Sequence, residues 1–158
     1  MRTRSITIAD EAALTPLAIA LAAALPDRAF VALSGDLGAG KTTFVKALAA
    51  AIGIDPAEVV SPTFGLVHSH AGAGRRLVHA DMYRLTAAGD LHEIGWDDAL
   101  AGPGWALVEW PERIAAALPA DRIDVAIRID SPTGRTFTFT GRGPAHEAAV
   151  ARLDAALR

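Results

Sequence analysis

Residues 29–43 of this chain, AFVALSGDLGAGKTT, join an apolar run to a glycine-rich turn. The run AFVAL has no polar alternation, which is typical of a strand covered on both faces in a parallel sheet. The turn fits the pattern G-x-x-x-x-G-K-[ST], with Gly35, Gly40, Lys41 and Thr42 at its fixed positions. This stretch predicts a strand, a phosphate-binding loop and a helix in succession.

The residue types of this loop suit a chain of phosphate groups. Glycines let backbone N–H groups converge on phosphate oxygens, the lysine meets the outer phosphates, and the next hydroxyl binds magnesium. Val45, Leu48 and Ile52 then form one helical stripe, which Gly53 is expected to end. The alternative is a glycine turn with a solvated lysine, but the strand before and the helix after it favour a nucleoside triphosphate site.

Composition limits the classes to which the protein can belong. A chain of 158 residues with 51% hydrophobic content predicts one P-loop domain spanning residues 1–158. A net charge of -3, with basic residues scattered along the chain, argues against a stand-alone nucleic-acid binder. The absence of cysteine excludes disulfides and thiol catalysis. The apolar segment at 14–26 is too short to span a bilayer, so we expect a cytoplasmic protein.

The remaining patterns alternate between strand and helix, and two late segments alternate apolar and polar residues, as an antiparallel pair does. The predicted fold class is α/β, a P-loop NTPase with a mixed, largely parallel central sheet flanked by helices. The expected strands are 4–8, 29–33, 65–70, 75–80, 105–110, 121–130 and 135–141, and the expected helices are 10–25, 41–52, 90–100, 111–118 and 144–157.

Acidic residues follow two of the apolar runs. Asp81 ends LVHAD and Glu109 ends ALVE, and ligands collect at the carboxyl edge of a parallel sheet. Magnesium held by Thr42 needs a carboxylate, which either residue could supply, although each could also be a solvated strand end. His79, two residues before Asp81, is expected to orient that carboxylate or to pack beneath it.

Five stretches, in this order and spacing, resemble the TsaE family, formerly YjeE: GDLGAGKTTF, SPTF, HADMYRL, HEIGWDD and LVEWPER. This is a family of bacterial P-loop ATPases of tRNA threonylcarbamoyladenosine (t6A) synthesis, and the resemblance spans about residues 4–142. The loop alone is shared by very many NTPases, whereas the combination is far more specific. The resemblance implies ATP and Mg²⁺ as cofactors and the proteins TsaB and TsaD as partners, with tRNA met only indirectly through their complex.

The resemblance also implies roles for single residues. Lys41 contacts the phosphates, Thr42 and Glu109 hold magnesium, and Thr43 supports the region of the α-phosphate. Asp81 orients water or senses the γ-phosphate. The implied catalytic residues are Lys41, Asp81 and Glu109.

Adenine contacts are implied at two places, Asp10 and Glu11 after the first strand and Arg135 near the later strands. Asp10 could instead cap the first helix, and Arg135 could lie in a solvated turn. The implied nucleotide-binding set is Asp10, Glu11, Gly35, Gly38, Ala39, Gly40, Lys41, Thr42, Thr43 and Arg135.

Five residues are assigned to a switch or to a partner surface. Ser61 and Thr63 occupy the region where P-loop switch segments respond to the γ-phosphate, with a plain turn as the alternative. Tyr83 and Arg84 follow the HxD pattern, and Arg84 could stabilise transition-state charge or form a structural ion pair. Trp110 is either a core aromatic or, as the family pattern favours, part of the surface that meets TsaB and TsaD.

Two rival functions use the same loop. A small-molecule kinase would need an acceptor pocket and an arginine-bearing cover, which Arg75, Arg76 or Arg84 could supply. A GTPase-like switch would need D-x-x-G and N-K-x-D stretches, and the sequence has neither.

Overall fold

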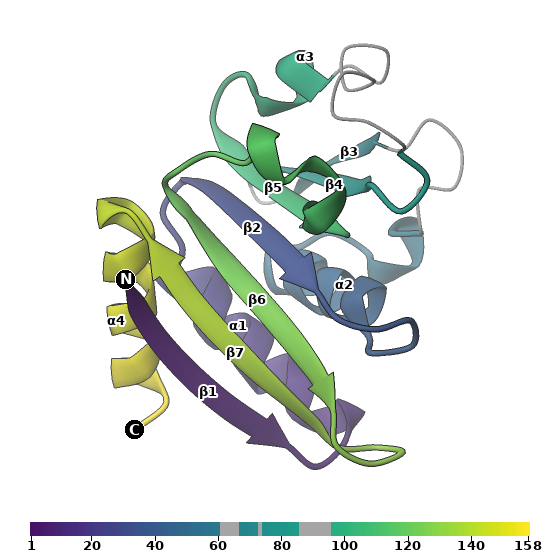
Figure 1. Ribbon diagram of the computed structural model, residues 1–158, viewed down its shortest axis with the longest axis vertical. Coiled ribbons are helices and arrows are strands. Elements are labelled where there is room, and N and C mark those ends of the chain that lie inside the picture. The colour runs from purple at the N-terminus through teal and green to yellow at the C-terminus, as the bar shows by residue number, and fades with distance from the viewer. Residues whose placement is uncertain (61–66, 73, 86–95) are drawn as a thin grey trace.

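In the computed structural model of the protein, helices flank a mixed sheet (Figure 1). The structure describes residues 1–60, 67–72, 74–85 and 96–158, and within them one seven-stranded sheet has the order β1-β7-β6-β2-β5-β4-β3. The strands are β1 (Arg2–Ile8), β2 (Arg28–Ser34), β3 (Val67–Gly72), β4 (Arg75–Asp81), β5 (Gly104–Glu109), β6 (Arg122–Ile129) and β7 (Arg135–Arg142). The helices are α1 (Leu14–Ala24), α2 (Lys41–Ala51), α3 (Trp96–Leu100) and α4 (Pro144–Ala156).

Parallel pairing occupies the centre of the sheet and antiparallel pairing its edges. Strand β2 runs parallel to β5 and β6, and β4 runs parallel to β5. The pairs β1–β7, β6–β7 and β3–β4 are antiparallel. The predicted mixed sheet, its β3–β4 hairpin and its β6–β7 pair are therefore confirmed. The parallel centre places the carboxyl ends of β2, β4, β5 and β6 at one edge, where the loop leaves β2.

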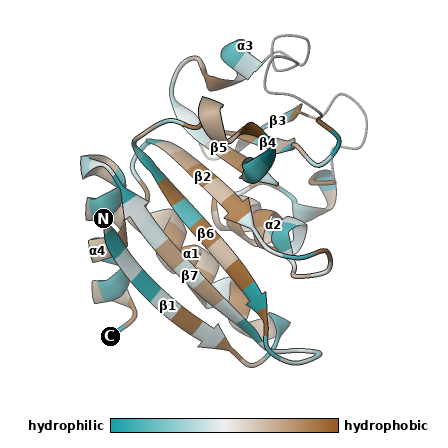
Figure 2. Ribbon diagram, in the orientation of Figure 1, coloured by the Kyte–Doolittle hydropathy of each residue, from teal (hydrophilic) through white to brown (hydrophobic). Residues whose placement is uncertain are grey.

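The hydropathy of the central strands follows from burial on both sides of the sheet. Strand β2 is hydrophobic along most of its length, whereas β6 alternates (Figure 2). One face carries the larger core, to which α1, α2 and α4 contribute, and Phe44 and Leu21 are fully buried there. The other face carries a smaller cluster that includes Phe30, Trp96 and Ile114.

The first helix begins later than the sequence predicts. Asp10 caps a short 3-10 turn, Glu11–Ala13, and its Oδ1 accepts a hydrogen bond from the Ala13 backbone N–H at 3.3 Å. Helix α1 starts only at Leu14. Pro16 has no backbone N–H to donate within a helix. Because α1 starts at Leu14, Pro16 lies in the first turn, where the backbone N–H groups have no partner within the helix in any case.

The expected helix at 111–118 is instead a 3-10 segment, Pro111–Ala117, broken at Ile114, where φ is -129°. Only Pro111 and Ile114 are buried in it, and a short segment without a continuous apolar stripe gains too little from packing to hold an α-helix. Of the expected helix at 90–100, α3 is the part within the described residues. No helix in the described ranges is long and apolar enough to cross a membrane.

Candidate nucleotide-binding site

The glycine loop joins the carboxyl end of β2 to the first turn of α2, as predicted. Its glycines at 35, 38 and 40 all have positive φ, and Gly40, at 102°, stands directly before the helix. A Cβ atom on Gly35 would lie 2.8 Å from the Ile127 carbonyl oxygen, so the loop passes close to β6. Only glycine suits both demands, and the resulting turn aims the free N–H groups of the α2 N-terminus at the sheet edge.

Lys41 is a buried cation held by neutral groups. Its exposed fraction is 6%, and its ammonium donates hydrogen bonds to the carbonyl oxygens of Gly35 and, at 3.3 Å, of Asp36. Nζ also lies 4.0 Å from the centre of a Trp110 ring. Burial lowers the pKa of Lys41, although nearby carboxylates, Glu109 foremost, oppose that shift. A partly desolvated ammonium whose hydrogen bonds go to neutral carbonyl oxygens gains strongly from an anion such as a phosphate.

Thr42 and Glu109, assigned to magnesium from the sequence, meet in the structure. The Thr42 hydroxyl donates to both carboxylate oxygens of Glu109, at 3.0 and 2.9 Å, and Glu109 is 3% exposed. A hydroxyl and a carboxylate are oxygen ligands of the kind that Mg²⁺ takes together with substrate phosphates. The described part of the chain holds no cluster of three or more His, Cys, Asp or Glu that could bind a metal. The residues present therefore fit a cation that one carboxylate and a phosphate chain share.

Asp81 lies at the same edge, because it stands opposite Glu109 in the β4–β5 register. Its Oδ1 accepts a hydrogen bond from the Tyr83 backbone N–H at 3.0 Å. His79 was expected to orient Asp81 or to pack beneath it, but its hydrogen bond goes to the other carboxylate, with 2.5 Å between His79 Nε2 and Glu109 Oε2. The sequence spacing places His79 near Asp81, whereas the pairing of β4 with β5 brings it to Glu109.

Aromatic side chains line the Lys41 side of the site. Trp110 has φ 57° and is the only residue other than glycine with positive φ in the described ranges. Its ring centre lies 4.9 Å from that of Tyr83, and the Arg113 guanidinium lies 5.6 Å from the Tyr83 ring. Tyr83 is 43% exposed, whereas Trp110 is half-buried and packs against the smaller core cluster. Both interpretations of Trp110, a core aromatic or part of a partner surface, therefore stay predictions.

The remaining switch and partner assignments stay predictions. Arg84 is exposed just after β4, near the carboxyl edge of the sheet. Ser61 and Thr63 lie outside the described residues.

A cavity of about 220 Å³ lies beside the loop, where the adenine contacts were expected. It contains the predicted residues Glu11 and Arg135 but not Asp10. Thr133, from the turn between β6 and β7, was missed by sequence reasoning, although this turn follows the end of a strand parallel to β2. The full lining is Ile8, Glu11, Leu14, Gly38, Ala39, Gly40, Thr43, Pro132, Thr133, Arg135 and Phe137.

Arg135 lines this cavity together with residues of the loop and is hydrogen-bonded to that loop. Its guanidinium donates to the carbonyl oxygens of Ala39 at 3.0 Å and Gly38 at 3.4 Å, and to those of Ser131 and Gly134 at 2.9 and 2.8 Å. It is therefore not in a solvated turn. Every one of these acceptors is a backbone carbonyl, so Arg135 ties the β6–β7 turn to the phosphate-binding loop.

The central strand of the mixed sheet leads through a G-x-x-x-x-G-K-T loop into a helix, and a threonine–glutamate pair lies at the carboxyl edge of the sheet. These features define a protein of the P-loop class. The family model described as "Threonylcarbamoyl adenosine biosynthesis protein TsaE" matches residues 8–137. This chain belongs to the TsaE family.

Individual relatives agree with this assignment. The chain is 39% identical over 114 residues to the tRNA threonylcarbamoyladenosine biosynthesis protein TsaE of Treponema pallidum, covering 72% of this chain and 83% of the relative. It is 38% identical over 115 residues to the protein of the same name from Bacillus subtilis, covering 73% and 71%. A crystal structure of YdiB from Bacillus subtilis matches with a TM-score of 0.81 at 28% identity, covering 99% of this chain and 97% of that one.

Proposed function

We propose that this protein binds and hydrolyses ATP with magnesium as a component of the t6A machinery, acting with TsaB and TsaD. The observation that carries the proposal is the contact of Thr42 with both oxygens of Glu109, beside a buried Lys41 in a P-loop. The family description, which names threonylcarbamoyl adenosine biosynthesis, supports the pathway. In this proposal tRNA is reached only through the partners, and the cytoplasmic location stays a prediction.

The chain's own residues supply the binding of the phosphates. Backbone N–H groups of the loop and of the α2 N-terminus receive the phosphate oxygens, and the Lys41 ammonium exchanges its bonds to Gly35 and Asp36 for bonds to the outer phosphates. Thr42 and Glu109 would hold magnesium, which when bound neutralises charge on the phosphates. Asp81 lies opposite Glu109 at the same edge, within the region where a carboxylate orients the attacking water.

The cavity beside the loop suits the base. Ile8, Leu14 and Phe137 give it apolar walls, which favour the flat faces of adenine, and Thr133 adds a hydroxyl that can select a base by hydrogen bonding. The hydrogen bond from Arg135 to the Ala39 carbonyl oxygen holds this side of the cavity in place.

Two of the three arginines that could cover the site of a kinase lie away from the glycine loop. Arg75 and Arg76 begin β4, so they lie at the amino edge of the parallel strands, whereas the phosphate-binding loop leaves the carboxyl edge. Arg75 pairs there with Asp27, and Arg76 donates to the Ala101 carbonyl. Neither side chain is placed to close over a phosphate in the loop.

Steady-state ATP hydrolysis, with and without TsaB and TsaD, tests the proposal. We expect the partners to raise the rate, and Lys41→Ala and Glu109→Ala to lower it by on the order of 100-fold, because each removes charge stabilisation at the phosphates. Lys46→Ala, on the same helix, is the control and should keep the wild-type rate.

Two results would contradict the proposal. Hydrolysis that the partners leave unchanged would remove TsaB and TsaD from it, while wild-type hydrolysis by Lys41→Ala would remove the site itself. Phosphate transfer to a nucleoside or sugar without partner proteins would establish the kinase instead.

A further inference from the structure

His79 is buried in the layer between the sheet and α2. It is 0% exposed, and it shares a sheet face with Leu77, which belongs to the core that α2 covers. In the β4–β5 register His79 stands opposite Leu107, two positions before the Asp81–Glu109 pair. A side chain at this diagonal position can reach along the sheet face to Glu109.

Among the described residues, two side chains donate hydrogen bonds to the Glu109 carboxylate. The Thr42 hydroxyl reaches both of its oxygens, and His79 Nε2 lies 2.5 Å from Oε2. Thr42 sits on α2 and His79 on β4, so the carboxylate is held from a helix and from the neighbouring strand at once. A hydroxyl binds a cation through an oxygen lone pair, so Thr42 can still donate its hydrogen to Glu109 when the cation is bound, and His79 holds the carboxylate from the other side.

The other nitrogen of the ring shows that packing alone does not explain this histidine. Because the carboxylate accepts, Nε2 carries a hydrogen in this contact, and Nδ1 is the remaining polar atom of the ring. Nδ1 is buried and has no hydrogen-bond partner among the described residues. A buried polar atom left without a partner costs about 1–3 kcal/mol, which an apolar side chain of similar size would not cost. The bond to Glu109 is the contact that histidine makes here and an apolar residue cannot.

We infer that His79 is a positioning residue, which holds the Glu109 carboxylate in the orientation that binds a divalent cation together with Thr42. This inference rests on the proposed function, because it assumes the metal at Thr42 and Glu109. Residues that fix the ligands of a metal typically change its affinity by about 10–100-fold when they are replaced. His79 is 0% exposed and so offers no surface to a bound nucleotide, and its loss should leave the affinity for metal-free nucleotide unchanged.

The test measures binding rather than turnover. The affinity for ADP is titrated at increasing Mg²⁺ by calorimetry, and Mn²⁺ binding in the presence of ADP is followed by electron paramagnetic resonance. For His79→Leu we expect the apparent affinity for either cation to fall about 10–100-fold. His79→Gln, whose amide N–H can still donate to Glu109, should recover most of it.

A matched control comes from the paired strand. His68 stands opposite His79 in the β3–β4 register and is half-buried, so His68→Leu makes the same replacement beside the site and should not change cation affinity. Circular dichroism establishes that each variant is folded. Should His79→Leu not fold, His79→Phe offers an apolar ring in its place.

The outcomes separate the inference from the proposed function. Wild-type cation affinity in a folded His79→Leu or His79→Phe variant, with Thr42→Val losing the dependence on Mg²⁺, overturns the role of His79 and leaves the metal site standing. An ADP affinity that does not depend on Mg²⁺ even in the wild-type protein overturns the metal site, and the role of His79 with it.

Discussion

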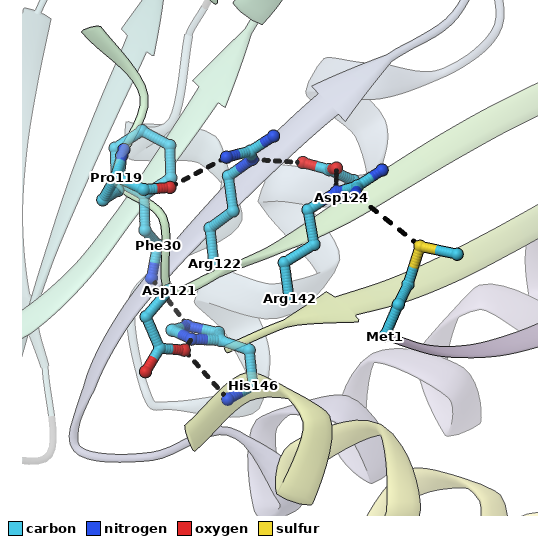
Figure 3. Close-up of polar contacts among 8 residues, drawn as sticks. All are labelled: Met1, Phe30, Pro119, Asp121, Arg122, Asp124, Arg142 and His146. Atoms are coloured by element: carbon cyan, nitrogen blue, oxygen red, sulfur yellow. Dashed lines mark hydrogen bonds and ion pairs between the residues drawn. The ribbon is translucent and has the colours of Figure 1, made fainter. Parts of the chain in front are cut away.

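His146→Leu is expected to destabilise the protein without reaching the nucleotide site. His146 stands near the start of α4, between Asp121 and the backbone of Phe30 (Figure 3). Its Nε2 accepts the Phe30 N–H at 3.1 Å, so Nδ1 carries the ring hydrogen and donates to Asp121 Oδ1 at 2.6 Å. The ring is 3% exposed and links α4, β2 and the segment before β6.

The expected loss of stability in His146→Leu follows from the two hydrogen bonds that leucine cannot make. The Phe30 N–H is left without its acceptor in a residue that is 5% exposed, which costs about 1–3 kcal/mol. The Asp121 side chain is 42% exposed, so water replaces much of its lost bond and the cost there is about 0.5–1 kcal/mol. We therefore expect a loss of about 1.5–4 kcal/mol in the free energy of unfolding, or on the order of 10 °C in Tm.

Urea unfolding followed by circular dichroism measures this loss. His146→Gln is the matched variant, because its amide offers an acceptor and a donor, and it should recover part of the stability. A loss below about 1 kcal/mol in His146→Leu would refute the reasoning, since it would mean that the Phe30 N–H finds another acceptor. Metal-free ADP affinity should be that of the wild-type protein, because Phe30 lies near the start of β2 and the loop follows its end.

Three further predictions concern Asp121 and the loop. Burial raises the pKa of Asp121, but hydrogen bonds from the His146 ring and from the Ala145 and His146 backbone outweigh it and hold the pKa below its usual value. The stabilisation by the Asp121 carboxylate is therefore complete above the unfolded-state pKa, about 3.9, and is lost as pH falls through the lower folded-state pKa. The Tm of Asp121→Asn should accordingly lie below that of the wild-type protein at neutral pH, and this difference should shrink below about pH 4. A difference in Tm that does not depend on pH would contradict this. Gly35→Ala should lower the free energy of unfolding by about 1–3 kcal/mol, because a Cβ atom at position 35 would lie 2.8 Å from a backbone oxygen. It should also weaken ATP binding more than Gly38→Ala does, because a Cβ atom at position 38 meets open space. Equal losses of ATP affinity in the two variants, measured by calorimetry, would argue against the close contact at Gly35. Arg135→Met should weaken the binding of inorganic triphosphate as well as of ATP if the arginine acts by holding the loop, whereas a loss confined to ATP would make it an adenine contact.

Prediction from the sequence succeeded where the predicted elements are neighbours in one short stretch of the chain. The glycine loop, its strand and its helix are continuous along the chain, so their order and the places of Lys41 and Thr42 at the start of the helix could be predicted from local pattern. Glu109 was also predicted as one of two candidates, because it ends an apolar run. The break in the 3-10 segment at Ile114 was not predictable, since it depends on how little of that segment the core covers.

The sequence by itself determined the class of fold and the strand, glycine loop and helix that follow one another, because turn conformation, helix start and strand burial are set by neighbouring residue types. Only the tertiary structure decided which distant side chains meet. The Thr42 hydroxyl donates directly to Glu109, His79 bonds to Glu109 and not to Asp81 as expected, and Arg135 bonds to the loop from a strand that begins about a hundred residues later. These contacts depend on the register of strands far apart in the chain, and no spacing within the sequence encodes a register.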